Sequence, residues 1–207
     1  MALQLRRLPK LTSLCHKALL GDSSVERIVV EYCGQIKKIF TACLCQQHLR
    51  NLKEVRVIGC KKLQEIIATG HSSGCLENSI IELPSLRTLE MDDLPSLSSF
   101  FPGKLLPCCS IEHITIRDCP NLRGLPLFGH EAPLAAPCLQ GIKADKELWK
   151  SLEWDNPKLK QLLQPFTKLN DANIPSFKIH KGSVYCSIQF LKKKNMETHK
   201  VELFPCI

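Results

Sequence analysis

Apolar residues recur in this chain at fixed distances from one another. Counted from Ile111, the stretch Ile111–Leu125 has apolar side chains at positions 0, 3, 5, 11 and 14 and a cysteine at position 8. Three upstream stretches, which start at Val25, Leu52 and Leu86, occupy the same six positions with apolar residues or cysteine. The starts lie 27, 34 and 25 residues apart, and the longest spacing contains a Gly- and Ser-rich insertion at residues 68–79. Such a period is typical of repeats that stack into a solenoid.

Each copy of the pattern is interpreted as one turn of a coil. Positions 3 and 5 alternate with more polar positions, as in a short strand with one buried face. One turn cannot bury its own apolar edge, so the turns must stack. We therefore predict an α/β fold, a leucine-rich-repeat solenoid with a curved parallel sheet on its concave side and irregular or short helical segments on its convex side. The strands are expected near residues 27–30, 54–57, 88–91 and 113–116.

Two further regions flank the clear repeats, which we place at residues 21–144. Residues 1–20 keep part of the pattern and are interpreted as a partial or degenerate repeat. Residues 145–167 change to helical spacing, so we predict a C-terminal helical cap that closes the open end of the coil. The cap contains both tryptophans of the chain, and an aromatic ligand pocket is the alternative interpretation of Trp149 and Trp154.

The cap is expected to begin at Asp145, as the N-cap of its first helix, and to end where a tail starts at residue 168. Residues 168–207 follow no repeat and have little periodic apolar surface, so we expect a mobile tail. Alternating apolar residues over 184–190 could nevertheless add one strand to an open edge of the sheet.

The strand positions that alternate with the buried ones face away from the core. They form a candidate protein-binding concave face, which consists of Arg27, Glu31, Glu54, Arg56, Ile58, Thr88, Glu90, Asp92, His113, Thr115 and Arg117. Equal positions on adjacent strands lie about 4.8 Å apart. We therefore predict the ion pairs Arg27–Glu54, Arg56–Glu90 and Asp92–Arg117, each contributing about 0.2–1 kcal/mol. These pairs stabilise the sheet in one interpretation and recognise a protein partner in the other, and the two are compatible.

Composition narrows the class of protein. Hydrophobic residues make up 44% of the 207 residues, which is enough for a sizeable core, and the formal net charge is +8. No apolar run is long enough to span a membrane. Charges and Pro9 interrupt the N-terminus where a signal peptide would be apolar, so we expect a cytoplasmic protein. The chain lacks the basic stripe with aromatic residues that is typical of nucleic-acid binding, so no nucleic-acid partner is expected.

The cysteines and the absence of catalytic motifs indicate whether the chain holds a metal or catalyses a reaction. Three of the twelve cysteines occupy position 8 of their repeats and are predicted to be buried thiols, namely Cys33, Cys60 and Cys119. Cys43, Cys45 and His48 form a C-x-C-x-x-H cluster without a clear fourth zinc ligand, so we predict a convex-side linker and no metal site. The sequence has no P-loop, dinucleotide-binding, serine-hydrolase or zinc-protease motif. We therefore predict neither a cofactor nor an enzyme activity.

Four segments resemble one family of known proteins. They are N-L-K-E-V-R-V-I-G-C-K-K-L-Q-E-I-I at 51–67, L-P-S-L-R-T-L-E-M-D-D-L-P-S-L at 83–97, C-P-N-L-R-G-L-P-L at 119–127 and K-E-L-W-K-S-L-E-W-D at 146–155. They are similar to repeats of plant coiled-coil nucleotide-binding leucine-rich-repeat disease resistance proteins. The resemblance implies that the repeats recognise pathogen effectors and hold the nucleotide-binding switch off. The family's P-loop and coiled coil are missing from this sequence, so nucleotide exchange is not assigned to it.

From the repeats and the resemblance we predict the protein-recognition and autoregulatory leucine-rich-repeat region of a plant disease resistance protein, which acts in innate immunity by protein binding. The partner is expected to be a pathogen effector, a guarded host protein or the nucleotide-binding domain of the same receptor. The alternative is a leucine-rich-repeat substrate adaptor of a ubiquitin ligase. That alternative requires an F-box before the repeats, and none is visible in the sequence.

Overall fold

The computed structural model describes most of the repeats, the cap and two parts of the tail. The described residues are 1–12, 24–41, 49–68, 80–102, 104–105, 108–125, 138–154, 157–171 and 187–191. The predicted linker cluster of Cys43, Cys45 and His48 lies outside these residues, and so do residues 69–79 of the predicted insertion.

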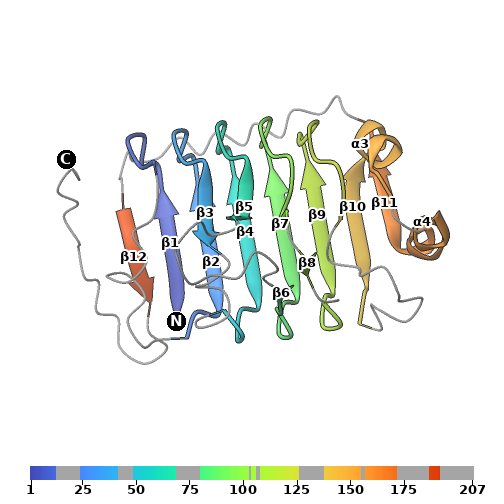
Figure 1. Ribbon diagram of the computed structural model, residues 1–207, viewed down its shortest axis with the longest axis horizontal. Coiled ribbons are helices and arrows are strands. Elements are labelled where there is room, and N and C mark those ends of the chain that lie inside the picture. Colours follow the sequence, from blue (N-terminus) through green and yellow to red (C-terminus); the bar gives the residue numbers. More distant parts are fainter. Residues whose placement is uncertain are drawn as a thin grey trace.

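Eight strands lie side by side in one sheet, in the order β11-β10-β9-β7-β4-β2-β1-β12 (Figure 1). The strands are β1 (Ala2–Arg6), β2 (Arg27–Glu31), β4 (Glu54–Ile58), β7 (Thr88–Asp92), β9 (His113–Arg117), β10 (Gly141–Asp145), β11 (Thr167–Asn170) and β12 (Ser187–Leu191). Neighbours pair in parallel from β11 to β1, and β12 pairs with β1 antiparallel. The four predicted strands and the predicted parallel solenoid are therefore confirmed.

The register of the sheet follows the sequence repeat without a slip. Arg27 pairs with Glu54, Glu54 with Thr88, and Thr88 with His113, so equal repeat positions are direct neighbours. The partial repeat at the N-terminus joins in the same register, because Ala2 of β1 pairs with Arg27 of β2. A slip by one residue would turn the apolar side chains of a strand outward, which explains why the register is conserved along the coil.

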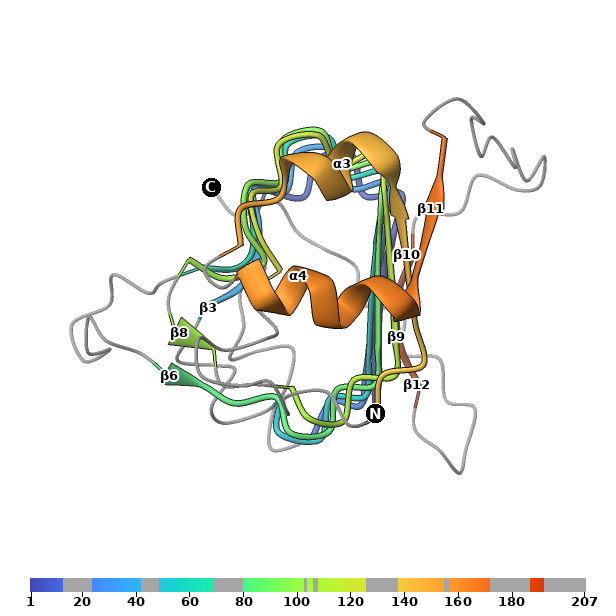
Figure 2. The ribbon, with the colours of Figure 1, turned by 90° about the vertical axis from the view of Figure 1, so that its right-hand side faces the viewer.

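The core lies between the main sheet and short strands on the opposite side of the coil (Figure 2). All six apolar positions are buried in all four clear repeats, and the most exposed of these side chains, Leu125, is only 8% exposed. On the opposite side, β3 (Lys38–Thr41) pairs with β5 (Glu65–Ala68), and β6 (Ile80–Ile81) pairs with β8 (Lys104–Leu105). Each turn thus buries its apolar edge against the next turn, as stacking requires.

A second repeated feature lies where each main strand ends, at position 7. This residue has a positive φ in five successive turns, with values of 53°, 56°, 65°, 56° and 49° at Arg7, Tyr32, Gly59, Asp93 and Asp118. Its N–H donates to the carbonyl of the last residue of the next strand. The N···O distances are 2.8 Å from Arg7 to Glu31, 2.8 Å from Tyr32 to Ile58, 2.9 Å from Gly59 to Asp92 and 3.1 Å from Asp93 to Arg117. Because these bonds join adjacent turns, the left-handed residue at position 7 is part of the stacking.

The cysteines at position 8 follow directly and are buried, as predicted. Their exposed fractions are 0% for Cys33, 0% for Cys60 and 1% for Cys119, and all three are free thiols. Each Sγ donates to the carbonyl two residues earlier, at 3.5 Å for Cys33, 3.5 Å for Cys60 and 3.1 Å for Cys119. The thiol therefore fills the inside of the turn and satisfies a backbone acceptor there.

Short helices and a further strand lie at the C-terminal end of the coil. They are α3 (Lys146–Ser151), α4 (Pro157–Leu163) and a 3₁₀ turn η1 (Gln164–Phe166), which leads directly into β11. Leu148, Trp149, Leu152 and Leu163 are buried against the last turn, and α4 lies across the end of the coil (Figure 2). Asp145 occupies the N-cap position of α3, but its side chain makes no capping hydrogen bond. The predicted N-cap residue is therefore confirmed by position, although its carboxylate does not bond to the first turn of the helix.

Two parts of the predicted mobile tail, residues 168–207, are strands of the main sheet. β11 extends the sheet beyond β10, and β12 lies at the opposite edge beside β1 (Figure 1). β12 overlaps the alternating stretch at 184–190 that was expected to add a strand to an open edge. The other tail residues, 172–186 and 192–207, lie outside the described part of the chain, and the mobility of the tail stays a prediction.

Candidate protein-binding face

The sheet carries all eleven residues of the predicted face on the side away from the core, which we call the outer sheet face. The register arranges them in rows across the strands. One row contains Arg27, Glu54, Thr88 and His113, the next contains Arg56, Glu90 and Thr115, and the last contains Glu31, Ile58, Asp92 and Arg117. These residues therefore form one continuous surface.

The three ion pairs predicted between direct neighbours are present. Arg27 Nε lies 2.7 Å from Glu54 Oε2. Arg56 Nε lies 3.3 Å from Glu90 Oε2, and Arg117 Nη2 lies 3.1 Å from Asp92 Oδ2. Each pair joins adjacent strands at equal repeat positions, so sequence spacing was sufficient to find it.

Three further ion pairs, which the sequence analysis missed, connect Arg56–Glu90 and Arg117–Asp92 with Arg6 and Glu31 into one chain of alternating charge. One of them joins direct neighbours, with Arg6 Nε 3.3 Å from Glu31 Oε2. The other two are diagonal, with Arg56 Nε 3.6 Å from Glu31 Oε1 and Arg117 Nη2 3.7 Å from Glu90 Oε1. Together these contacts form what we call the ion-pair ladder, which crosses β1, β2, β4, β7 and β9 and consists of Arg6, Glu31, Arg56, Glu90, Arg117 and Asp92. The long arginine side chains make the diagonal contacts possible.

Arg6 was not among the predicted face residues, because β1 was not recognised as a strand. A signal for it was present in the sequence. Counting back from Leu8 at position 8 places Leu3 and Leu5 at positions 3 and 5, and both are buried. Arg6 then occupies position 6, like Glu31 on the next strand, with which it pairs in register.

The ladder is balanced in charge and partly shielded from water. Its arginine side chains are 33–47% exposed and its carboxylates 13–25% exposed. Burial raises the pKa of Asp92, and the positive charge of Arg117 acts in the opposite direction with a smaller effect. The Nε–H groups of Arg56 and Arg117 are buried and make no hydrogen bond within the described part of the chain. The contacts of Arg56 Nε with Glu31 and Glu90 are therefore ionic.

The rest of the outer sheet face is less charged. Thr88, Thr115 and Ile58 are partly exposed and His113 is exposed. Val29 also points outward, yet it is only 4% exposed between its register neighbours Gln4 and Arg56. Within the described residues, no group of three or more His, Cys, Asp or Glu side chains is arranged to hold a metal ion. No helix of the described part of the chain is both long and apolar enough to cross a membrane.

Comparison with known proteins finds relatives of one kind, plant disease resistance proteins. Residues 1–128 match the family model of RPS2-like plant disease resistance proteins, leucine-rich repeats. The disease resistance protein At4g27190 of Arabidopsis thaliana is 29% identical over 119 residues, which are 56% of this chain and 11% of the relative. The probable disease resistance protein At5g47260 of Arabidopsis thaliana is 28% identical over 172 residues, which are 74% of this chain and 18% of the relative. No solved structure matches the chain.

The matches cover only a small part of the relatives, between 10% and 18% of their length. They favour the disease resistance hypothesis over the ubiquitin-ligase adaptor, which none of these relatives supports. The stacked turns, the parallel sheet and the buried repeat positions agree with the same family. With the family model covering more than half of its residues, the chain belongs to the RPS2-like plant disease resistance proteins and comprises a leucine-rich-repeat region of that family.

Proposed function

We propose that this leucine-rich-repeat region recognises a protein partner through its outer sheet face. The observation that carries the proposal is the ion-pair ladder, a row of alternating charges across five adjacent strands. Ion pairs hold the arginines in place before any partner arrives, so a contact costs little additional side-chain entropy. Arginine is also enriched in the centres of protein interfaces.

The balance of charge limits what a partner can be. The three arginines and three carboxylates of the ladder cancel, so a uniformly acidic or basic partner gains little from long-range attraction. A protein surface that carries both signs can match each charge of the ladder in register. The partner classes considered are a pathogen effector, a guarded host protein and the nucleotide-binding domain of a disease resistance protein. Contact with the last of these would be autoregulatory.

A charge exchange separates recognition from sheet stabilisation. The pair Arg27–Glu54 suits it, because no other ion pair of either side chain occurs within the described residues. The double variant Arg27→Glu with Glu54→Arg keeps an ion pair between β2 and β4. It reverses the sign of the charge that a partner contacts at each of the two positions. We expect its stability to stay within about 0.5 kcal/mol of the parent, while binding weakens by about tenfold or more.

The probe for this test is the part of the relative At4g27190 outside the segment that matches this chain. The matched control exchanges Lys150 and Glu147 on α3, outside the outer sheet face. These two side chains form an ion pair with an N···O distance of 2.8 Å. This control should leave both binding and stability unchanged. If the double variant at Arg27 and Glu54 binds the probe as tightly as the parent does, the ion pairs of the face only stabilise the sheet, or the face binds a partner of another class. Binding of effector candidates to the same two variants then distinguishes these cases.

A further inference from the structure

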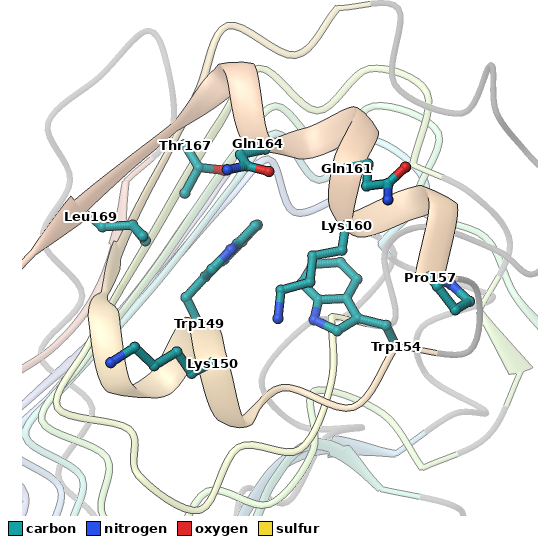
Figure 3. A pocket seen from close by; sticks show the side chains of 9 residues that line it. All are labelled: Trp149, Lys150, Trp154, Pro157, Lys160, Gln161, Gln164, Thr167 and Leu169. Carbon is teal, nitrogen blue, oxygen red and sulfur yellow. The ribbon is translucent and has the colours of Figure 1, made fainter.

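A pocket opens at the C-terminal end of the coil, between α3, α4 and β11 (Figure 3). Its volume is about 810 Å³, within the usual range of small-molecule sites. We call it the cap pocket, and its walls are formed by Trp149, Lys150, Trp154, Pro157, Lys160, Gln161, Gln164, Thr167 and Leu169.

Aromatic rings form two walls of the cap pocket. The ring centroids of Trp149 and Trp154 are 5.0 Å apart, with an angle of 65° between the ring planes. Trp149 is only 5% exposed and Trp154 is partly exposed, so the ring surface open to a third aromatic group belongs mainly to Trp154. Leu169 of β11 adds an apolar side chain that is 40% exposed. A flat apolar group of similar size would be buried on several sides here.

The polar groups of the cap pocket are mostly donors. Trp154 Nε1–H is buried and has no acceptor within the described part of the chain. The Nζ of Lys160 lies 6.0 Å from the centroid of the Trp154 ring, and Figure 3 shows it on the side of the indole nitrogen. In the described residues Lys160 makes no ion pair, whereas Lys150 is paired with Glu147 at 2.8 Å. Among the described residues that line the pocket, none has a carboxylate side chain.

We propose that the cap pocket binds a small aromatic carboxylate, with its ring against Trp149 and Trp154 and its carboxylate between Lys160 and the Trp154 N–H. An anion supplies the acceptor that the buried indole N–H lacks, and leaving a buried donor unpaired is costly. A charge-assisted hydrogen bond from Lys160 adds to it. The size of the pocket and the short distance between the rings suit one aromatic ring system rather than a folded partner.

The chain offers a direct measurement, because Trp149 and Trp154 are its only two tryptophans. Tryptophan fluorescence, excited selectively over that of the two tyrosines, therefore reports on the cap pocket alone. The probe is 4-iodobenzoate, whose iodine quenches an indole in contact with it. Its uncharged counterpart 4-iodobenzamide and free iodide are the controls. We expect saturable quenching by 4-iodobenzoate with half-saturation at about 1 mM or below, weaker quenching by the amide, and only linear collisional quenching by iodide.

Variants test the two proposed hydrogen-bond donors, Lys160 and the Trp154 N–H. Lys160→Gln should weaken 4-iodobenzoate binding about tenfold and leave the weak effect of the amide unchanged. Lys158→Gln is the matched control, since it removes the same charge from α4 outside the pocket wall and should change binding less than twofold. Trp154→Phe keeps an aromatic wall but removes the N–H, and quenching of Trp149 should then require several-fold more ligand. Circular dichroism checks that each variant is folded.

Three results would overturn the proposal. One is linear quenching that is equal for the acid and the amide. The second is an equal loss of affinity in Lys160→Gln and Lys158→Gln, which would show a general charge effect. The third is quenching that weakens as the protein concentration rises, because a second copy of the chain would then occupy the cap pocket.

Discussion

The backbone N–H of Asp118 donates a hydrogen bond to Oδ2 of Asp145, with an N···O distance of 2.7 Å. In the preceding turns the residue at position 7 donates instead to a backbone carbonyl of the next strand. After β10 the chain enters α3, and the carboxylate of Asp145 takes the place of that carbonyl. Asp145 therefore ends the series of hydrogen bonds between turns.

Removing this acceptor should destabilise the C-terminal end of the coil. Asp145→Ala leaves the Asp118 N–H without its partner, and we expect a loss of about 1–2 kcal/mol in the free energy of unfolding. Asp145→Asn keeps an oxygen acceptor and should lose about half as much. Urea denaturation measures both values. Equal losses would show that the negative charge next to the N-terminus of α3 matters more than the acceptor.

The buried thiols should react far more slowly than the exposed ones. Burial raises the pKa of Cys108 and of Cys119 to about 12, so neither forms a thiolate at neutral pH. Cys109 and Cys138 are exposed and serve as internal controls. Alkylation with iodoacetamide at pH 8, followed by peptide mass spectrometry, should label the controls within minutes and Cys119 only on unfolding. Labelling of Cys119 at the rate of Cys138 would contradict the buried turn.

Asp92 should cost stability at neutral pH although it pairs with Arg117. Its raised pKa means that the folded state binds the proton of Asp92 more tightly than the unfolded state does. Its contribution is therefore favourable below the ordinary pKa of aspartate and is lost as the pH rises through the raised value. We expect Asp92→Asn to be more stable than the parent at pH 7 and equal to it at strongly acidic pH. Thermal melts over this range measure the difference, and a less stable variant at pH 7 would show that the ion pair outweighs burial.

Gly59 and Tyr32 occupy position 7 of adjacent turns and are in close contact. A Cβ added to Gly59, whose φ is +65°, would lie 2.5 Å from Cδ1 of the half-exposed Tyr32 ring. Gly59→Ala should therefore cost about 1 kcal/mol for the left-handed backbone and a further amount for displacing the ring. In a Tyr32→Ala background only the backbone cost should remain. Urea denaturation of the four combinations tests this, and strictly additive losses would exclude the contact.

The tail was expected to be mobile, and removing a mobile tail should cost no stability, but its two strands change that expectation. Truncation after Asp171 removes β12 and should have a small effect on Tm. Truncation after Phe166 also removes β11, whose hydrogen bonds cover β10 and whose Leu169 forms part of the cap pocket. We expect the second truncation to lower Tm by more than about 5 °C, which is roughly 1–2 kcal/mol for a chain of this size. An unchanged Tm after both truncations would support the original prediction.

The amino-acid pattern was sufficient to predict the coil, its register and the three direct ion pairs of the outer sheet face. Each of these depends on spacing alone, because equal positions in successive turns become neighbours once the turns stack. The burial of Cys60 and the Arg27–Glu54 contact follow in this way. Even Arg6 could have been placed by counting back from Leu8.

Contacts that depend on side-chain reach, or on where the repeat ends, could not be predicted from the pattern and are seen only in the folded protein. The Glu31–Arg56 diagonal requires an arginine that reaches across strands at unequal positions, and the left-handed backbone at Tyr32 leaves no mark in the apolar pattern. The bond from Asp118 to Asp145 arises because a helix replaces the next turn, so a side chain must supply the acceptor. The pairing of β12 with β1 joins opposite ends of the chain, and no local spacing in the sequence encodes such a contact.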